Sequence, residues 1–182
     1  DRMDAGILNA TSRVKILKQT PTTAVLDGGV GIGLAIGPRA MQLAIAKAKK
    51  HGIGMVCVKD STHYGFAGYY ALMASEAGCI GVTGTNARPS IAPTYGVEPM
   101  MGTNPLVFGI PSDDDFPFVL DCATSTQQRG KIEKWNREGK ATPKGAVITT
   151  DGDELTDSAD ILAALVARKA ALTTEEECEA AA

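Results

Sequence analysis

The stretch that decides the fold is IGMVCVKDSTHYGFAGYYALMASEAGCIGVT, residues 53–83. Its first part, 53–58, is a short apolar run of the kind that forms a buried strand. A polar turn follows, and then a segment, 66–77, whose apolar residues recur at helical spacing. Gly78 ends this helix, and residues 79–83 predict another strand. A strand, a helix and a further strand in this order indicate an α/β fold.

The residues before this stretch predict a strand and a helix. Residues 20–27 have the composition of a short strand, and apolar residues recur at helical spacing from Pro38 to Gly52, where glycine can adopt the left-handed cap conformation. The glycine-rich residues 28–33 lie between them and match neither the dinucleotide-binding fingerprint nor the phosphate-binding loop of nucleotide hydrolases. We therefore expect an irregular turn there and a fold other than the Rossmann fold.

The residues after this stretch begin with 86–105, which contain too many prolines and glycines for a regular element but are too apolar for a disordered linker. We expect an ordered functional loop. The pattern then predicts a short antiparallel strand pair at 106–110 and 118–120, followed by a helix over 125–138. Further along the chain it predicts a turn at 151–153, a helix over 158–171 and a capping box at Thr174 and Glu177. No repeat or linker divides the chain, so residues 1–182 are interpreted as one α/β domain, a mixed sheet with flanking helices.

The composition and net charge of the chain argue against several classes of protein and of partner. The chain is 44% hydrophobic and carries a net charge of -3, which argues against a disordered chain and against nucleic acid as a partner. No apolar run reaches the roughly 18 residues of a membrane-spanning helix, so we expect no membrane partner and a cytoplasmic protein. The four cysteines are scattered and the chain has two histidines, so we expect no metal site, and three of the cysteines read as small buried apolar residues (Cys57, Cys79, Cys122).

His63 is the most informative single residue. It follows a strand and precedes a helix, beside Ser61 and Gly65, and a ligand site often lies at such a strand end. An imidazole there can exchange protons near neutral pH. A structural role, in which His63 caps the helix or fills the turn, is equally open from the residues alone.

Two further segments could face one cleft. Thr103 and Asn104 come just before a strand, and Asp121 to Thr124 come just after one. Their hydroxyl, amide and carboxylate groups can hydrogen-bond a ligand. The alternative is that Asp121 and Thr124 cap the helix expected from Ser125.

Several motifs in one order resemble the type 2 malate/L-lactate dehydrogenase family, which also includes ureidoglycolate, sulfolactate and diketogulonate oxidoreductases. The resemblance covers about Thr20 to Asp157, and its longest motifs are DSTHYGFAGYY at 60–70, GTNPL at 102–106, FVLDCATS at 118–125 and RGKI at 129–132. It implies a non-Rossmann nicotinamide-binding fold, NAD or NADP as the cofactor, a small 2-hydroxy or 2-keto acid as the substrate and a homodimer. Malate and oxaloacetate are the first choice of substrate pair.

The resemblance also assigns residues. His63 stands at the family's catalytic histidine, which takes the proton of the substrate hydroxyl in oxidation and returns it in reduction. The cofactor contacts that it implies are Asn86, Ala87, Thr103, Asn104, Asp121, Cys122, Ala123 and Thr124, with Cys122 in place of a family methionine. We expect that replacement to matter little if the contact is made by the backbone.

The resemblance covers the central part of the family's sequence. The family's N-terminal Ser-His-Gly segment and its later Gly-Gly-Tyr-Lys-Gly region find no counterpart in these residues, and the tail, 161–182, departs from the family pattern. The alternative to an oxidoreductase is therefore a catalytically inactive binding or assembly module of the same fold.

Overall fold

The computed structural model describes residues 2–149 and 151–154. The chain forms two compact units, of which the first contains Asp1–Gly84 and Leu106–Cys122 and the second contains Thr85–Pro105 and Ala123–Ala182. The expected functional loop thus belongs to a different unit from the strands on either side of it. No helix in the described part of the chain is long and apolar enough to cross a membrane.

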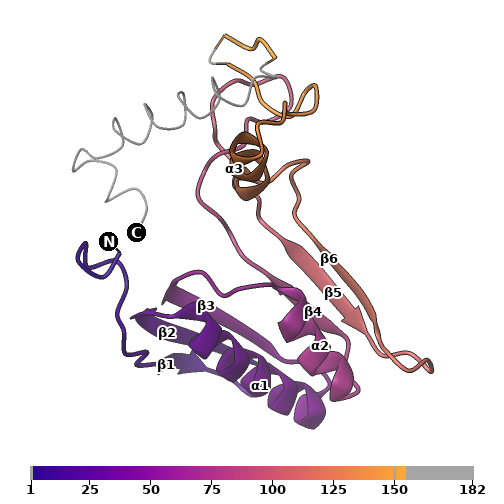
Figure 1. Ribbon diagram of the computed structural model, residues 1–182. Coiled ribbons are helices and arrows are strands. Elements are labelled where there is room, and N and C mark those ends of the chain that lie inside the picture. The colour runs from indigo at the N-terminus through magenta and orange to yellow at the C-terminus, as the bar shows by residue number, and fades with distance from the viewer. Residues whose placement is uncertain (1, 150, 155–182) are drawn as a thin grey trace. The chain divides into compact units, whose positions relative to one another are not determined.

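The first unit contains a mixed three-stranded sheet. Its strands are β1 (Lys15–Gln19), β2 (Thr23–Gly31) and β3 (Met55–Ser61), in the order β1-β2-β3. β2 pairs antiparallel with β1 and parallel with β3, which confirms the expected mixed sheet. Helix α1 (Gly33–His51) packs against β2 and β3 (Figure 1). The sequence pattern does not indicate β1, because every residue of this strand is exposed and the strand has no apolar alternation.

The glycine-rich segment is not the irregular turn that the sequence predicted. β2 continues through it to Gly31, with a shift of register against β3 between Asp27 and Gly31. Gly29 and Val30 adopt positive φ angles of 58° and 55° at this irregularity. The strand persists because backbone pairing with β3 resumes at Gly31, so long-range hydrogen bonding overrides the local preference of glycine.

Helix α1 starts at Gly33 and contains Pro38, so it begins earlier than predicted. A Cβ atom at Gly33 would lie 2.3 Å from the carbonyl oxygen of Thr62, and one at Gly37 would lie 2.5 Å from the Tyr70 ring. Glycine therefore lets the first turns of the helix approach these neighbours closely. The predicted end is confirmed, because Gly52 has a φ of 86° and donates its N–H to Ala48.

The first unit also contains an antiparallel sheet. Its strands are β4 (Gly81–Gly84), β5 (Leu106–Ile110) and β6 (Phe118–Cys122), in the order β4-β5-β6. Helix α2 (Gly68–Glu76) packs on this sheet and against α1. Ala71 of α2 and Val107 of β5 are fully buried between them. A Cβ atom at Gly81 or Gly109 would lie 2.7 Å from the Ala71 carbonyl oxygen, so glycine is required for this close packing.

The second unit contains helix α3 (Arg129–Arg137), which starts later than the predicted Ser125. The Ser125 hydroxyl donates to the Gln127 carbonyl at 2.9 Å, and Gln128 is extended, so a local turn replaces the first helical turn. Ile148 and Glu154 form an antiparallel bridge around the predicted turn. The helix expected over 158–171 and the capping box at Thr174 and Glu177 lie outside the described residues.

The cysteines are less buried than predicted. Cys57 and Cys122 are exposed and Cys79 is half-buried. Cys57 alternates along β3 with the half-buried Val56 and Val58, so its side chain lies on the opposite, uncovered face. An apolar strand segment can thus be covered on one face only.

Candidate functional site

The His63 turn connects β3 to α2. His63 is exposed, and its Nδ1 atom accepts a hydrogen bond from the Gly65 N–H at 3.0 Å. Gly65 has a φ of 83°, a conformation that favours glycine. A ring nitrogen that accepts a hydrogen bond carries no proton, so this bond leaves Nε2 as the ring nitrogen that can carry one.

Thr62 fixes the strand side of the His63 turn. Its hydroxyl donates to the Gly31 carbonyl at 3.0 Å, and its own N–H donates to the same carbonyl at 3.2 Å. The N–H of Gly33, the first residue of α1, donates to the Thr62 hydroxyl at 3.4 Å. The end of β2 and the start of α1 therefore both hold the backbone immediately before His63.

An aromatic cluster lies on the helix side of the His63 turn. The rings of Tyr64 and Tyr70 are stacked with their centroids 4.9 Å apart, and the Tyr70 hydroxyl donates to the Tyr64 carbonyl. Phe66 and Tyr69, both exposed, form an edge-to-face pair at 5.9 Å. No role for these tyrosines was predicted from the sequence, although Tyr64 and the Tyr69–Tyr70 pair flank the glycines of the same motif.

The buried phenol of Tyr64 leads to a pH-dependent prediction. Burial raises the pKa of Tyr64, the Thr83 hydroxyl offsets part of the rise, and the negative charge of Asp121 adds to it. The pKa of this phenol is therefore higher in the folded state than in the unfolded state. Its contribution to the stability of the fold is fully present at a pH below the unfolded-state pKa. This contribution is lost as the pH rises through the folded-state pKa. Tyr64→Phe is expected to flatten the alkaline decline of the free energy of unfolding, measured by urea denaturation. An unchanged alkaline slope would contradict the assignment.

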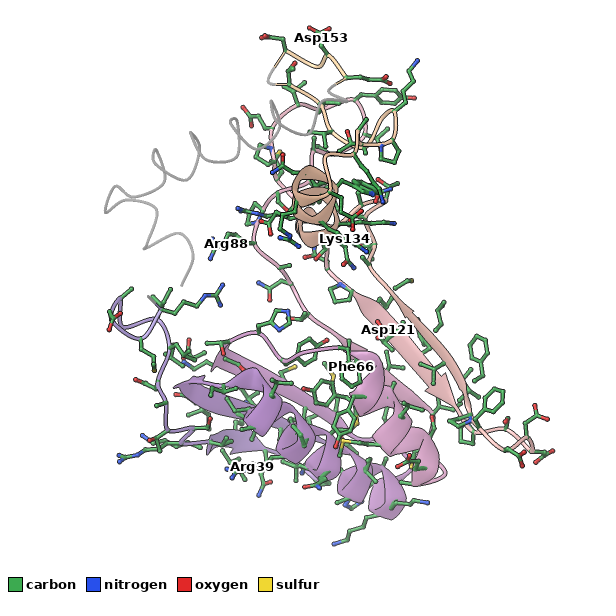
Figure 2. All side chains as sticks on the ribbon, viewed as in Figure 1. Arg39, Phe66, Arg88, Asp121, Lys134 and Asp153 are labelled. Atoms are coloured by element: carbon green, nitrogen blue, oxygen red, sulfur yellow. The ribbon has the colours of Figure 1, made fainter. Side chains whose placement is uncertain are left out.

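Asp121 lies near the end of β6 (Figure 2). Its Oδ2 atom accepts a hydrogen bond from the N–H of Gly68, the first residue of α2, at 2.7 Å. The alternative prediction is that Asp121 caps the helix expected from Ser125. This prediction is wrong, because the carboxylate binds the start of α2 instead. Cys122, the next residue, ends β6 opposite Leu106.

The other predicted cofactor contacts gather in the second unit. The Asn104 Oδ1 atom accepts the Ala87 N–H at 2.7 Å, and the Thr103 carbonyl accepts the Thr124 N–H at 2.9 Å and the Thr124 hydroxyl at 3.3 Å. A Cβ atom at Gly102 would lie 2.3 Å from the Ala87 carbonyl oxygen. The contact between Thr103 and Thr124 thus joins two segments that are separated in the sequence, 87–104 and the residues after 122.

Asn104 has a φ of 33°, in the region that asparagine tolerates better than most residues. Its bond to Ala87 uses the carbonyl end of the amide, so the Nδ2 group is left out of that bond. Asn86 is exposed and Ala123 is half-buried. Among the described residues, no hydrogen bond joins the Asn86 amide or the Cys122 thiol to the other predicted contacts.

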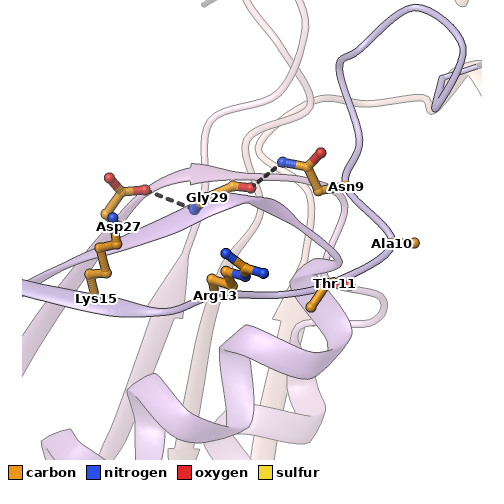
Figure 3. A pocket seen from close by; sticks show the side chains of 7 residues that line it. All are labelled: Asn9, Ala10, Thr11, Arg13, Lys15, Asp27 and Gly29. Carbon is orange, nitrogen blue, oxygen red and sulfur yellow. Dashed lines mark hydrogen bonds between the residues drawn. The ribbon is translucent and has the colours of Figure 1, made fainter.

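A pocket of about 500 Å³ lies on the first unit beside β1 and β2 (Figure 3), and none of the predicted site residues lines it. Its wall is held by Asn9, which donates to the Gly29 carbonyl at 2.8 Å, and by Asp27, which accepts the Gly29 N–H at 2.7 Å. Arg13 and Lys15 add positive charge to the lining. This pocket therefore shares no lining residue with the His63 turn.

Known proteins resemble this chain in sequence and fold. A malate dehydrogenase of Pyrococcus abyssi is 48% identical over 153 residues, which is 84% of this chain and 42% of that protein. An L-sulfolactate dehydrogenase of Methanocaldococcus jannaschii is 41% identical over 157 residues, 86% of this chain and 45% of that protein. The crystal structure of malate dehydrogenase from Entamoeba histolytica matches 88% of this chain and 45% of that chain, with a TM-score of 0.84 and 48% identity.

These matches confirm the expected fold class, and the chain spans less than half the length of the relatives. A sequence model described as malate/L-lactate dehydrogenase matches residues 1–174, nearly the whole chain. The chain therefore belongs to the malate/L-lactate dehydrogenase family.

Proposed function

We propose that this chain carries the proton-exchanging and cofactor-binding part of an NAD(P)-dependent dehydrogenase that interconverts a 2-hydroxy acid and a 2-keto acid. The observation that carries the proposal is the hydrogen bond from the Gly65 N–H to Nδ1 of the exposed His63, which leaves Nε2 as the nitrogen that can give a proton to the substrate. Two relatives are a malate dehydrogenase and an L-sulfolactate dehydrogenase, so the substrate class we propose is a small 2-hydroxy acid, with malate first.

The residues of the second unit suit a nicotinamide dinucleotide. The cofactor, when bound, supplies or accepts the hydride. The Gly102 backbone approaches Ala87 so closely that a Cβ atom would not fit, and Thr103, Asn104 and Thr124 bring hydroxyl and amide groups beside this backbone. Asn86, Ala87 and Ala123 complete the proposed contacts of the second unit. In the first unit, the proposed contacts at the end of β6 are Cys122 and the backbone of Asp121. Hydroxyl, amide and exposed backbone groups are the donors and acceptors that ribose and carboxamide groups need.

His63 exchanges the proton. In keto-acid reduction, the Nε2–H of the neutral ring donates to the substrate carbonyl oxygen, and that oxygen takes the proton as it becomes the hydroxyl. A hydronium ion of the solvent gives its proton to Nδ1, which displaces the Gly65 N–H from that atom and leaves water. The ring thus ends neutral, with its proton on Nδ1 and its lone pair on Nε2. The oxidation direction reverses each step: Nε2 takes the hydroxyl proton and Nδ1 returns one to water. The bond from Gly65 thus favours the tautomer that pairs with the keto acid.

The test is turnover by the purified protein. NADH and NADPH are each titrated with the protein to measure the Kd, and oxidation of each is then followed by absorbance with oxaloacetate, glyoxylate or pyruvate. We expect micromolar binding of one cofactor and turnover of at least one keto acid. Cofactor binding without turnover of any acid would support the inactive module, and the absence of both would overturn the proposal.

Asn104 gives a second test of the cofactor site. Asn104→Ala removes the acceptor for the Ala87 N–H and places alanine at a positive φ, so the loop loses the bond that shapes it. We expect the Kd for NAD(P)H to rise about 10-fold, since an unsatisfied backbone donor costs about 1–3 kcal/mol. Ser90→Ala, at an exposed position of the same loop, serves as the control and should leave the Kd within about twofold. Equal Kd values for the two variants would contradict this role.

A further inference from the structure

Helix α2 begins directly after the His63 turn, yet its own sequence does not cap it. The N-cap residue is Ala67, which offers no side-chain acceptor, and the first turn contains no acidic residue. The first N–H groups of any helix lack partners within the helix. An acceptor for this helix must therefore come from elsewhere in the fold.

Asp121 provides that acceptor across a separation of 53 residues in the sequence. Its Oδ2 atom lies 2.7 Å from the Gly68 nitrogen, at the positive end of the helix dipole. Asp121 pairs with Val107 in the sheet, and directly paired residues share a face. Since Val107 is fully buried beneath α2, Asp121 occupies the same helix-covered face, where its carboxylate meets the start of the helix.

Gly68 and Asp121 fit one another sterically. A Cβ atom at Gly68 would lie 2.8 Å from Asp121 Oδ2 and 3.4 Å from the Asp121 Cβ atom. Gly68 itself is buried. A side chain at Gly68 would therefore push the carboxylate away from the N–H that it binds.

The start of α2 is in turn connected to the residue after His63. Tyr70, in the first turn of α2, donates its hydroxyl to the Tyr64 carbonyl and stacks its ring on Tyr64. Asp121 is close enough to this pair for its charge to add to the rise of the Tyr64 pKa that burial causes. A continuous set of contacts thus runs from Asp121 through the first turn of α2 to the backbone beside His63.

We propose that Asp121 is a positioning residue, whose carboxylate fixes the start of α2 and, through Tyr70 and Tyr64, orients the backbone that carries His63. The inference rests on the proposed function of His63. It gives the Asp121 side chain a task different from direct contact with the cofactor, because the carboxylate is already bound to Gly68. Asp121 then influences the chemical step without touching the reacting atoms.

The experiment compares Asp121→Asn with Asp121→Ala in the purified protein. Asparagine keeps an oxygen that can accept the Gly68 N–H, so its kcat should stay within about 3-fold of the wild-type value. Alanine removes the acceptor, and we expect kcat to fall about 10-fold or more while the Kd for NAD(P)H changes less than about twofold. Asp115→Ala, which removes an exposed carboxylate in the β5–β6 connection, is the matched control and should change neither quantity.

A spectroscopic measurement tests the same point without turnover. The ¹⁵N chemical shifts of the His63 ring report which nitrogen carries the proton. We expect a protonated Nε2 and an accepting Nδ1 in the wild type and in Asp121→Asn, and a mixture of tautomers in Asp121→Ala, where the Gly65 bond loosens. If the wild type has no turnover, the proposed function fails, but these shifts still decide whether Asp121 positions His63.

Gly68→Ala covers the case in which Asp121→Ala fails to fold. It retains the carboxylate but displaces it, so it should reproduce the fall in kcat and the tautomer mixture. Combining it with Asp121→Ala should then add little further loss, because both act on one contact. Two results would overturn the proposal. The first is a Kd for NAD(P)H that rises by clearly more than twofold in both Asp121→Asn and Asp121→Ala, and the second is a set of His63 shifts that neither Gly68→Ala nor Asp121→Ala changes.

Discussion

Replacing His63 with alanine is expected to lower kcat for keto-acid reduction by about 100- to 10,000-fold, the range that a positioned general acid or base contributes. The substitution removes the Nε2–H that donates to the substrate oxygen and the nitrogen that recovers the proton in the reverse direction. His63 is exposed, and within the described part of the chain its ring makes one hydrogen bond, which it accepts from the Gly65 N–H, so its removal should leave the fold intact. The measurement is steady-state kinetics with the preferred cofactor and oxaloacetate, beside the Kd for that cofactor.

His51→Ala is the matched control, because His51 is the other histidine of the chain. It is exposed in the last turn of α1, where it can interact with the helix dipole but has no proposed contact with substrate. We expect His51→Ala to keep kcat within about twofold of the wild-type value. If His63→Ala retains most of the wild-type kcat, or if both substitutions lower it equally, His63 is not the proton-exchanging residue.

Gly54→Ala is expected to cause the largest loss of stability. A Cβ atom at Gly54 would lie 2.0 Å from the Ala44 carbonyl oxygen and 2.8 Å from the Ala48 nitrogen, both in the backbone of α1. Backbone atoms cannot rotate away as a side chain can, so α1 and β3 would have to separate. We expect the free energy of unfolding to fall by about 3 kcal/mol, and the Tm of a chain of this size by roughly 6–12 °C.

Gly130→Ala is the control for Gly54→Ala. It makes the same chemical change in α3, where an added Cβ atom would meet nothing within 4 Å. Alanine is the better helix former, so this variant should be neutral or more stable by up to about 1 kcal/mol. Thermal and urea unfolding of both variants provide the comparison. A similar loss of stability in both would show that steric conflict with α1 is not the cause.

The succession of elements through residues 53–83 could be predicted from the sequence because it depends on short-range patterns. The strand within 53–58 and the helix within 66–77 correspond to β3 and α2, although the helix starts later and the strand extends further than predicted. Hydrophobic periodicity indicates that such elements exist, whereas packing against neighbours sets their ends. α1 shows this directly, since its start at Gly33 depends on contact with Thr62.

The candidate site was predictable in part. The motif placed His63 in a strand-to-helix turn, and the structure confirms that placement. Two contacts of the site could not be predicted, because they join residues far apart in the sequence. The bond between Asn104 and Ala87 spans 17 positions and the bond between Thr124 and Thr103 spans 21, and no local sequence pattern indicates either pairing. Whether these residues bind a cofactor and whether His63 exchanges a proton stay predictions for the experiments above.

The sequence by itself determined the family and the order of the main helices and strands, and it placed a histidine between β3 and α2, because these follow from local composition and spacing. Only the tertiary structure decided that Asp121 caps α2 rather than the helix after it. The physical reason is that a carboxylate binds whichever backbone N–H groups the completed fold leaves without a partner nearby. At Gly68 that N–H is exposed to Asp121 by the pairing of β5 with β6, which no local pattern in the sequence encodes.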